Sequence, residues 1–240
     1  MRVLDAQVQE WLNLAVRWIH VVVGIAWIGT SFYFNWLNNH IRPPRIPEPG
    51  VGGELWSVHG GDFYRVVKYE VAPEGLPTTL HWFKWEAYAT WISGVSLLFV
   101  VYYLGPLGIA VDPGKWDLPR WGLMVFGVAT MAAGWFIYDA LCRFLGSRPG
   151  WLAAAGFVLL TAAAYGYAQV LTGRAAYVHV GALIGTLMAA NVFLVIIPSQ
   201  RKMVDAMSRG EAPDPGPGQE AARRSLHNNY LTLPVVFIMV

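Results

Sequence analysis

The chain has 240 residues, of which 55% are hydrophobic and 13% are charged, and its mean hydropathy is +0.41. A charged share about half that of a soluble domain, together with 12 tryptophans, is the composition of an integral membrane protein. The net charge of +2 is too small to suggest a nucleic-acid partner, and the one cysteine, Cys142, excludes an internal disulfide framework.

Apolar stretches recur along the chain, each close to the ~20 residues that a helix needs to cross hydrocarbon. They predict an all-α fold, a single polytopic transmembrane helical bundle with full spans at residues 13–37, 82–104, 121–142, 151–171 and 176–198. A sixth span begins near Leu231 and is still apolar at Val240. We therefore expect the natural sequence to continue beyond this point.

Two long polar loops, residues 38–80 and 199–229, separate these spans. Within the first, the string FYRVVKYEV alternates in the way of a short strand or hairpin, and the second contains the flexible string EAPDPGPGQE. Lys and Arg are more frequent on the side of these loops than on the N-terminal side. The positive-inside rule therefore places both loops in the cytoplasm and the N-terminus outside.

Histidines inside the spans form a first candidate site. His20 lies just inside the start of the first span and His179 just inside the start of the fifth, so we expect their imidazoles at one depth near the outer face. Such a pair can ligate a haem iron, and Gly24, on the same helical face as His20, would let a flat macrocycle approach the backbone. We predict a haem b held by His20 and His179; the alternative is that each imidazole only hydrogen-bonds a neighbouring helix.

The string LHWFKWEAYATWISG, residues 80–94, forms a second candidate site. By i, i+3, i+4 and i+7 spacing, one helical face would carry His81, Lys84, Trp85 and Tyr88. This face suits a planar anionic ligand, with ring stacking to hold its plane and Lys84 to hold its charge. The alternative is an interfacial belt, because Trp and Tyr favour the headgroup zone and Lys snorkels there. Asp139, four residues before Arg143, is interpreted as half of a structural ion pair.

Three strings, HWFKWEAYATWISG, HGGDFYRVVKYEVAPEGLP and HNNYLTLPVVFIMV, resemble the N-terminal membrane domain of the bacterial urate oxidases that are linked to cytochrome c. The resemblance covers essentially the whole chain. It implies a multi-pass protein of the bacterial inner (cytoplasmic) membrane that oxidises urate to 5-hydroxyisourate in purine catabolism. It also implies that electrons leave through a cytochrome c domain; because the sequence contains no CxxCH motif, haem c is expected only on a C-terminal domain that is missing here.

With this resemblance, urate, a planar monoanion near neutral pH, is expected to bind from the cytoplasm. His81 or His227 would take a proton as a base. Electrons would pass to the haem and then to a periplasmic or fused cytochrome c. Two alternatives stay open: a transporter or channel for a purine-like anion, and a non-catalytic haem-binding subunit in the lipid bilayer. The expected substrate contacts are Lys84, Trp85, Tyr88 and Asn228.

Overall fold

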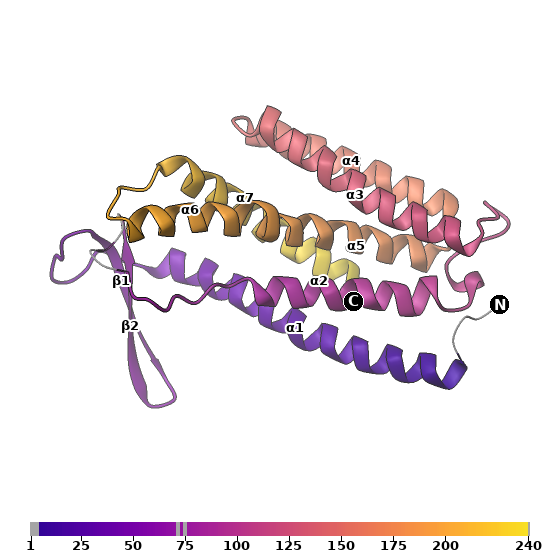
Figure 1. Cartoon of the computed structure of the whole chain (residues 1–240), viewed down its shortest axis with the longest axis horizontal. Helices are drawn as coiled ribbons and strands as arrows, with labels where there is room; N and C mark the ends of the chain where they lie inside the picture. Colours follow the sequence, from indigo (N-terminus) through magenta and orange to yellow (C-terminus); the bar gives the residue numbers. More distant parts are fainter. Residues whose placement is uncertain (1–4, 71–72, 74–75, 240) are drawn as a thin grey trace.

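The computed structural model describes residues 5–70, 73 and 76–239, so Val240, the last residue of the predicted sixth span, lies outside the described residues. Long helices run along the longest axis of the molecule, with the N-terminus at one end and a β hairpin at the other (Figure 1). In chain order the elements are α1 (Ala6–His40), β1 (Val51–His59), β2 (Asp62–Tyr69), α2 (Trp85–Leu98), the π-helix η1 (Phe99–Tyr103), the 3₁₀ turn η2 (Leu107–Ile109), α3 (Arg120–Leu145), α4 (Pro149–Val170), α5 (Gly173–Ala190), the π-helix η3 (Asn191–Ile196), α6 (Ile197–Ser208) and α7 (Pro215–Met239).

Within the described residues, four helices are long and apolar enough to cross a membrane: α1, α3, α4 and the continuous helix Gly173–Ser208, which joins α5, η3 and α6. The predicted second span folds as α2 followed by η1 and is not one of these four. The helix Gly173–Ser208 has 36 residues. At 1.5 Å per residue it is about 54 Å long, well beyond the ~30 Å of a hydrocarbon core, so α6 extends past the apolar layer at the hairpin end.

α5 is the central helix of the bundle and packs against α2, α3, α4 and α7. Its buried residues include Ala175, Ala176 and Gly181, whose small side chains allow neighbouring helices to approach closely. α1 instead packs mainly on α2 and exposes large apolar side chains, among them Trp18 and Ile25. Outward-facing apolar side chains on long helices are what contact with lipid requires.

Local sequence explains where several helices begin. The Asp5 carboxylate caps α1 by accepting hydrogen bonds from the backbone of Gln7 and Val8. The Thr172 hydroxyl caps α5 by accepting one from Ala175. α4 begins at Pro149, where the missing N–H costs nothing because the first turn has no intrahelical acceptor for it.

The fold is not all-α, because β1 and β2 form an antiparallel hairpin in the predicted loop 38–80. Gly60 and Gly61, with φ of 61° and 92°, supply the two-residue turn that such a hairpin needs. The Glu54 carboxylate ties the hairpin to the chain before it, by accepting hydrogen bonds from the Arg45 backbone and the Arg65 side chain, and these bonds lower the pKa of Glu54. The strand or hairpin predicted for FYRVVKYEV is therefore confirmed, and the fold class is corrected by it.

The second polar segment, residues 199–229, also differs from the prediction, because most of it is helical. α6 continues to Ser208 and ends before Gly210, whose φ of 73° suits a residue that follows a helix. α7 then begins at Pro215, because proline is tolerated in a first helical turn. His227 and Asn228 therefore lie within a helix rather than in a loop before a span.

Candidate functional site

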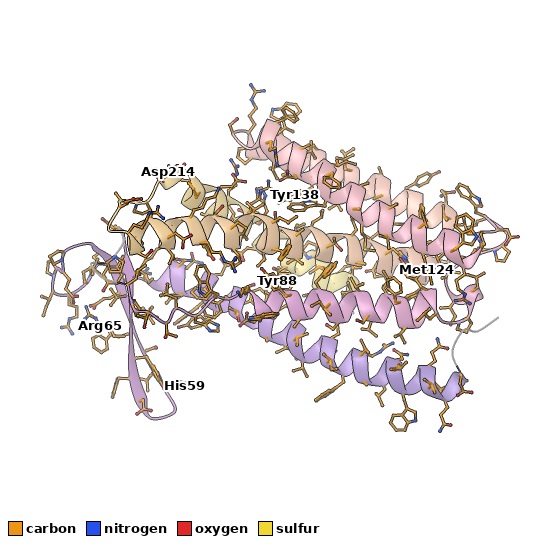
Figure 2. The ribbon with its side chains drawn as sticks, in the orientation of Figure 1. His59, Arg65, Tyr88, Met124, Tyr138 and Asp214 are labelled. Carbon is orange, nitrogen blue, oxygen red and sulfur yellow. The ribbon has the colours of Figure 1, made fainter. Side chains whose placement is uncertain are left out.

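A polar cluster lies inside the bundle toward the hairpin end, where α3, the α5–η3–α6 helix and α7 meet. Tyr138 projects from α3 toward this junction (Figure 2). Because polar and charged groups are costly inside an apolar bundle, such a cluster is a functional-site candidate. The residues of this inner cluster are Tyr138, Asp139, Asn191, Arg224, His227 and Asn228.

Arg224 is the charge at the centre of the inner cluster, and only 2% of it is exposed. Its guanidinium donates to Glu220 Oε1 at 2.9 Å, to Asp139 Oδ1 at 2.5 Å and to Asn191 Oδ1 at 3.3 Å. It also lies over the Tyr138 ring, 5.2 Å from the ring centroid. A guanidinium carries five N–H donors, so these bonds leave part of its donor capacity for a ligand.

Hydrogen bonds of the inner cluster define the state of His227. Its Nδ1 lies 2.8 Å from the Tyr138 hydroxyl, which itself accepts a hydrogen bond from Asn191 Nδ2 at 3.0 Å. The hydroxyl therefore directs its own proton at Nδ1, and the neutral imidazole carries its proton on Nε2. Nε2 has no hydrogen-bond partner among the described residues. This nitrogen is thus the free polar atom of the cluster.

The environment of His227 favours its neutral form. His227 precedes the apolar segment of α7 that begins at Leu231. Burial lowers its pKa below the ordinary value, and the positive charges of Arg224 and Arg223 lower it further. An imidazole held neutral near pH 7 can act as a general base.

Two carboxamides complete the inner cluster and fix its geometry. Asn191 Nδ2 donates to Asn228 Oδ1 at 2.9 Å, and Asn228 Nδ2 donates to the Met188 carbonyl at 3.0 Å. Asn191 is the first residue of η3, a π-helical segment of the kind that often accompanies functional sites. Both amides are therefore engaged within the protein, and they hold Arg224 and Tyr138 in place.

A second polar cluster, the outer cluster, lies at the end of the bundle where the N-terminus is. It consists of Tyr103, Gly127, Tyr167 and His179. His179 is fully buried; its Nδ1 donates to the Ala175 carbonyl at 2.7 Å, and its Nε2 accepts from the Tyr103 hydroxyl at 3.1 Å. The Tyr167 ring packs 5.6 Å from the imidazole, and a Cβ at Gly127 would overlap the Tyr103 hydroxyl. Both nitrogens of His179 are thus committed.

His20 lies far from His179, and the predicted shared depth is wrong. His20 Nδ1 is 3.0 Å from Ser93 Oγ on α2, whereas His179 contacts Tyr103, ten residues further along. That separation is roughly 15 Å along a helix. The reason is that α1 begins at Ala6 and α5 at Gly173, so His20 lies about four turns into its helix and His179 about two.

The residues present therefore do not fit a haem iron held between His20 and His179. The Tyr103 hydroxyl already occupies His179 Nε2. The contact of His20 is Ser93 on α2 and that of His179 is Tyr103 on η1, so the two imidazoles meet different parts of the chain. A Cβ at Gly24 would meet nothing within 4 Å, so the space that was predicted beside this glycine is open. Among the described residues, no three or more His, Cys, Asp or Glu side chains gather in a way that could hold a metal ion.

The face predicted for residues 81–88 is only partly formed. α2 begins at Trp85, so His81 and Lys84 precede the helix and helical spacing does not place them on its face. The His81 side chain is 68% exposed, and its Nε2 lies 3.6 Å from Glu86 Oε1. Trp85 and Tyr88 do share a face, with ring centroids 5.8 Å apart.

The structure separates this surface from His227 and Asn228. Tyr88 packs edge-on against Phe193 of η3, with ring centroids 5.6 Å apart. Tyr88 and Tyr138 lie on opposite sides of the α5–α6 helix (Figure 2). His227 and Asn228 therefore belong to the inner cluster, and Lys84, Trp85 and Tyr88 to another surface.

Sequence reasoning placed His227 and Asn228 in the site but missed the residues around them. Asp139 was interpreted as a partner of Arg143 alone, whereas it also accepts a hydrogen bond from the buried Arg224. A usable signal was present, because Arg224 and Asn228 are four residues apart and so share a helical face.

Long apolar helices that face outward, with a charged cluster enclosed between them, are the features of a multi-pass membrane protein. Residues 6–240 match the family described as urate oxidase N-terminal, and the chain belongs to this family. No curated protein and no solved structure matches the chain. The family suggested by the three strings is thus confirmed.

Proposed function

We propose that this chain is the membrane domain of a urate oxidase, which converts urate to 5-hydroxyisourate and passes the electrons to a cytochrome c. Membership of the urate oxidase N-terminal family supports a function related to urate oxidation. The structural observation that carries the proposal is the inner cluster, where the buried Arg224 lies close to an imidazole with an uncommitted nitrogen. A fixed cation and a neutral base are what oxidation of an acidic, planar purine requires.

The reaction balances with water as the source of oxygen. Urate and one water give 5-hydroxyisourate, two protons and two electrons, as a C–O bond forms at C5 of the purine. The electrons leave one at a time to ferric cytochrome c, each reducing one iron. This chain's residues are then required to bind the anion, to accept a proton and to exclude other reactions.

Arg224 is the residue we assign to the charge of urate. Its guanidinium is planar and can donate paired hydrogen bonds to a carbonyl or enolate oxygen. Asp139 and Glu220 hold the guanidinium from the other side. An oxygen of urate would use the donors that these carboxylates leave, and the low dielectric of the bundle would strengthen that contact.

His227 is the residue we assign to proton transfer. In the resting arrangement, the Tyr138 hydroxyl donates to Nδ1. In the other tautomer of His227 the proton is on Nδ1; if the Tyr138 hydroxyl then turns toward the Cys142 sulfur, which lies 3.8 Å from the same nitrogen, its oxygen accepts a hydrogen bond from Nδ1–H instead. Nε2 then presents a lone pair to the substrate. The Tyr138 hydroxyl would thus set which ring nitrogen acts as the base.

The surface of His81, Lys84, Trp85 and Tyr88 stays a predicted second place for substrate contact. It is separated from the inner cluster by η3, so the two surfaces can be tested independently. Lys84→Gln removes the cation of one surface, and Arg224→Gln that of the other. We expect Arg224→Gln to leave only a small residual urate turnover and Lys84→Gln to spare turnover; the opposite result would move the site to the surface that contains Lys84.

The activity itself is tested with the purified chain in lipid nanodiscs, without oxygen and with added ferric cytochrome c. We expect urate to disappear, 5-hydroxyisourate to form, and cytochrome c to be reduced in the ratio of two per urate. No reduction of cytochrome c in the presence of the chain and urate would reject the proposal. Movement of urate into proteoliposomes without any acceptor would instead support a transporter.

A further inference from the structure

A cavity of about 420 Å³ lies beside the inner cluster, where the end of α3 meets the start of α6 and the first half of α7. This size falls within the range of about 300–1,000 Å³ that is usual for small-molecule sites. Asp139 and Arg224 contribute to it from the inner cluster, and Leu194, Val195 and Pro198 add apolar lining. We call this cavity the basic groove.

Cations outnumber carboxylates in the basic groove. Asp139 forms ion pairs with Arg143 at 2.7 Å and with Arg224 at 2.5 Å, and Glu220 is shared between Arg224 and Arg223. The polar lining includes Asp139, Arg143, Lys202, Glu220, Arg223 and Arg224. Lys202 forms no ion pair with any residue in the described part of the chain. A cleft with apolar walls and a surplus of one charge concentrates ions of the opposite charge.

Arg223 adds a second, independent observation. Its Nε is buried and has no hydrogen-bond partner among the described residues, while its other end pairs with Glu220. Buried donors are almost always satisfied in folded proteins, so an unpaired one at a cavity calls for an acceptor. The Arg223 side chain as a whole is 38% exposed, so a small shift of the guanidinium into the groove would let a ligand oxygen accept from Nε.

We propose that the basic groove is the route by which the anionic substrate reaches the inner cluster, and that Lys202 and Arg223 capture it on the way. The identification of that anion as urate rests on the proposed function. Urate carries carbonyl oxygens around its edge, which match ammonium and guanidinium donors, and flat faces that match Leu194 and Pro198. Because α6 extends beyond the apolar layer, the groove lies near the water at the hairpin end of the bundle.

Capture and chemistry are separated by steady-state kinetics on the full protein. We expect Lys202→Gln to raise the KM for urate about five- to tenfold with kcat unchanged, and to weaken the salt dependence of kcat/KM. Arg201→Gln is the matched control, because Arg201 directly precedes Lys202 on the same helix and is exposed like it, but does not line the groove. Equal effects of the two variants would overturn the proposal.

Direct binding of radiolabelled urate to the same proteins separates this proposal from the proposed function. If the wild-type protein binds urate through Lys202 but does not oxidise it, the groove is supported and the oxidase function fails. If the wild-type protein oxidises urate but Lys202→Gln and Arg223→Gln leave both KM and binding unchanged, the oxidase function stands and the groove fails. If no urate binds, both fail.

Discussion

Two tyrosine–histidine pairs lie in different parts of the bundle, one in the outer cluster and one in the inner cluster. They differ in whether the imidazole keeps a ring nitrogen without a hydrogen-bond partner. In the outer cluster, His179 is fully buried and uses both ring nitrogens. In the inner cluster, His227 is only partly buried and uses Nδ1 alone among the described contacts. Each pair lies near a π-helical segment, η1 at Tyr103 and η3 at Asn191. The π turn therefore does not distinguish them; the uncommitted nitrogen does.

The comparison shows how the same two side chains can serve stability in one place and chemistry in another. The Tyr103–His179 pair satisfies its own polar groups and joins helices inside the bundle, and it therefore has no hydrogen-bonding nitrogen left for a ligand. The Tyr138–His227 pair keeps one ring nitrogen available to a ligand, and the buried Arg224 beside it supplies a positive charge. We infer that the inner cluster is reactive and the outer cluster structural.

The largest expected effect comes from replacing each histidine by alanine. His227→Ala should lower urate turnover about 10²- to 10⁴-fold, the usual contribution of a general base. It should lower the unfolding temperature less than His179→Ala does, because the Tyr138 hydroxyl can turn to the Cys142 sulfur as a second partner. His179→Ala should leave the Tyr103 hydroxyl without its acceptor and so cost about 1–3 kcal/mol of stability. Turnover per folded molecule should persist in this second variant. Thermal unfolding in detergent and turnover in nanodiscs measure both quantities, and a stable but inactive His179→Ala protein would reverse the assignment.

A smaller effect is expected from Gly127→Ala, which tests the outer cluster without touching a titratable group. The new Cβ would overlap the Tyr103 hydroxyl and press toward His179 Nε2, 3.4 Å away. Overpacking of this kind costs typically about 1–3 kcal/mol, so the unfolding temperature should fall. Gly24→Ala is the matched control, because its Cβ would meet nothing within 4 Å. Unfolding temperatures that fall equally in the two variants would show that the close contact at Tyr103 does not matter.

The smallest expected effect is a shift in the pH profile of the inner cluster. With His227 as the neutral base of the proposed reaction, kcat/KM should fall as the pH drops through its pKa, which burial and then Arg224 and Arg223 hold below the ordinary value. Arg224→Gln removes a nearby positive charge; the pKa of His227 should rise, and the acid limb of the residual activity should move to higher pH.

Arg224→Lys is the control for this shift, because it keeps the positive charge but loses the planar donor geometry. It should weaken urate binding and leave the acid limb near its wild-type position. Profiles of kcat/KM against pH for the three proteins make the measurement. An acid limb that stays in place in Arg224→Gln would mean that His227 is not the group that titrates.

The sequence was a good guide where one local pattern decides the structure. Alternating residues in FYRVVKYEV were enough to predict a strand or hairpin, and long apolar runs to predict most of the helices. It was a poor guide to the depth at which a side chain lies along the bundle. His20 and His179 were matched by their distance from expected span starts, whereas α1 begins at Ala6, well before the predicted start of its span.

Helical spacing was also applied where no helix exists. His81 and Lys84 were placed on a face with Tyr88, but α2 begins only at Trp85. The spacing of residues along one helix tells on which side of the helix a side chain lies, but not which neighbouring helix that side contacts. The partners of Arg224 come from three separate helices, α3, η3 and α7 itself, so only the packed bundle could reveal them.

The π-helical segment η3 also determines how the protein would respond to the loss of a single residue. A π turn is equivalent to an α-helix with one residue inserted, and η3 lies between the Met188 contact of Asn228 and the groove residue Lys202. Deleting one residue from η3 would restore the α-helical count and rotate α6 by about 100° relative to α5. Lys202 would swing out of the groove although no residue of the site had been substituted. Deletion of a single codon there would thus weaken anion binding in the basic groove while leaving the residues of the inner cluster unsubstituted.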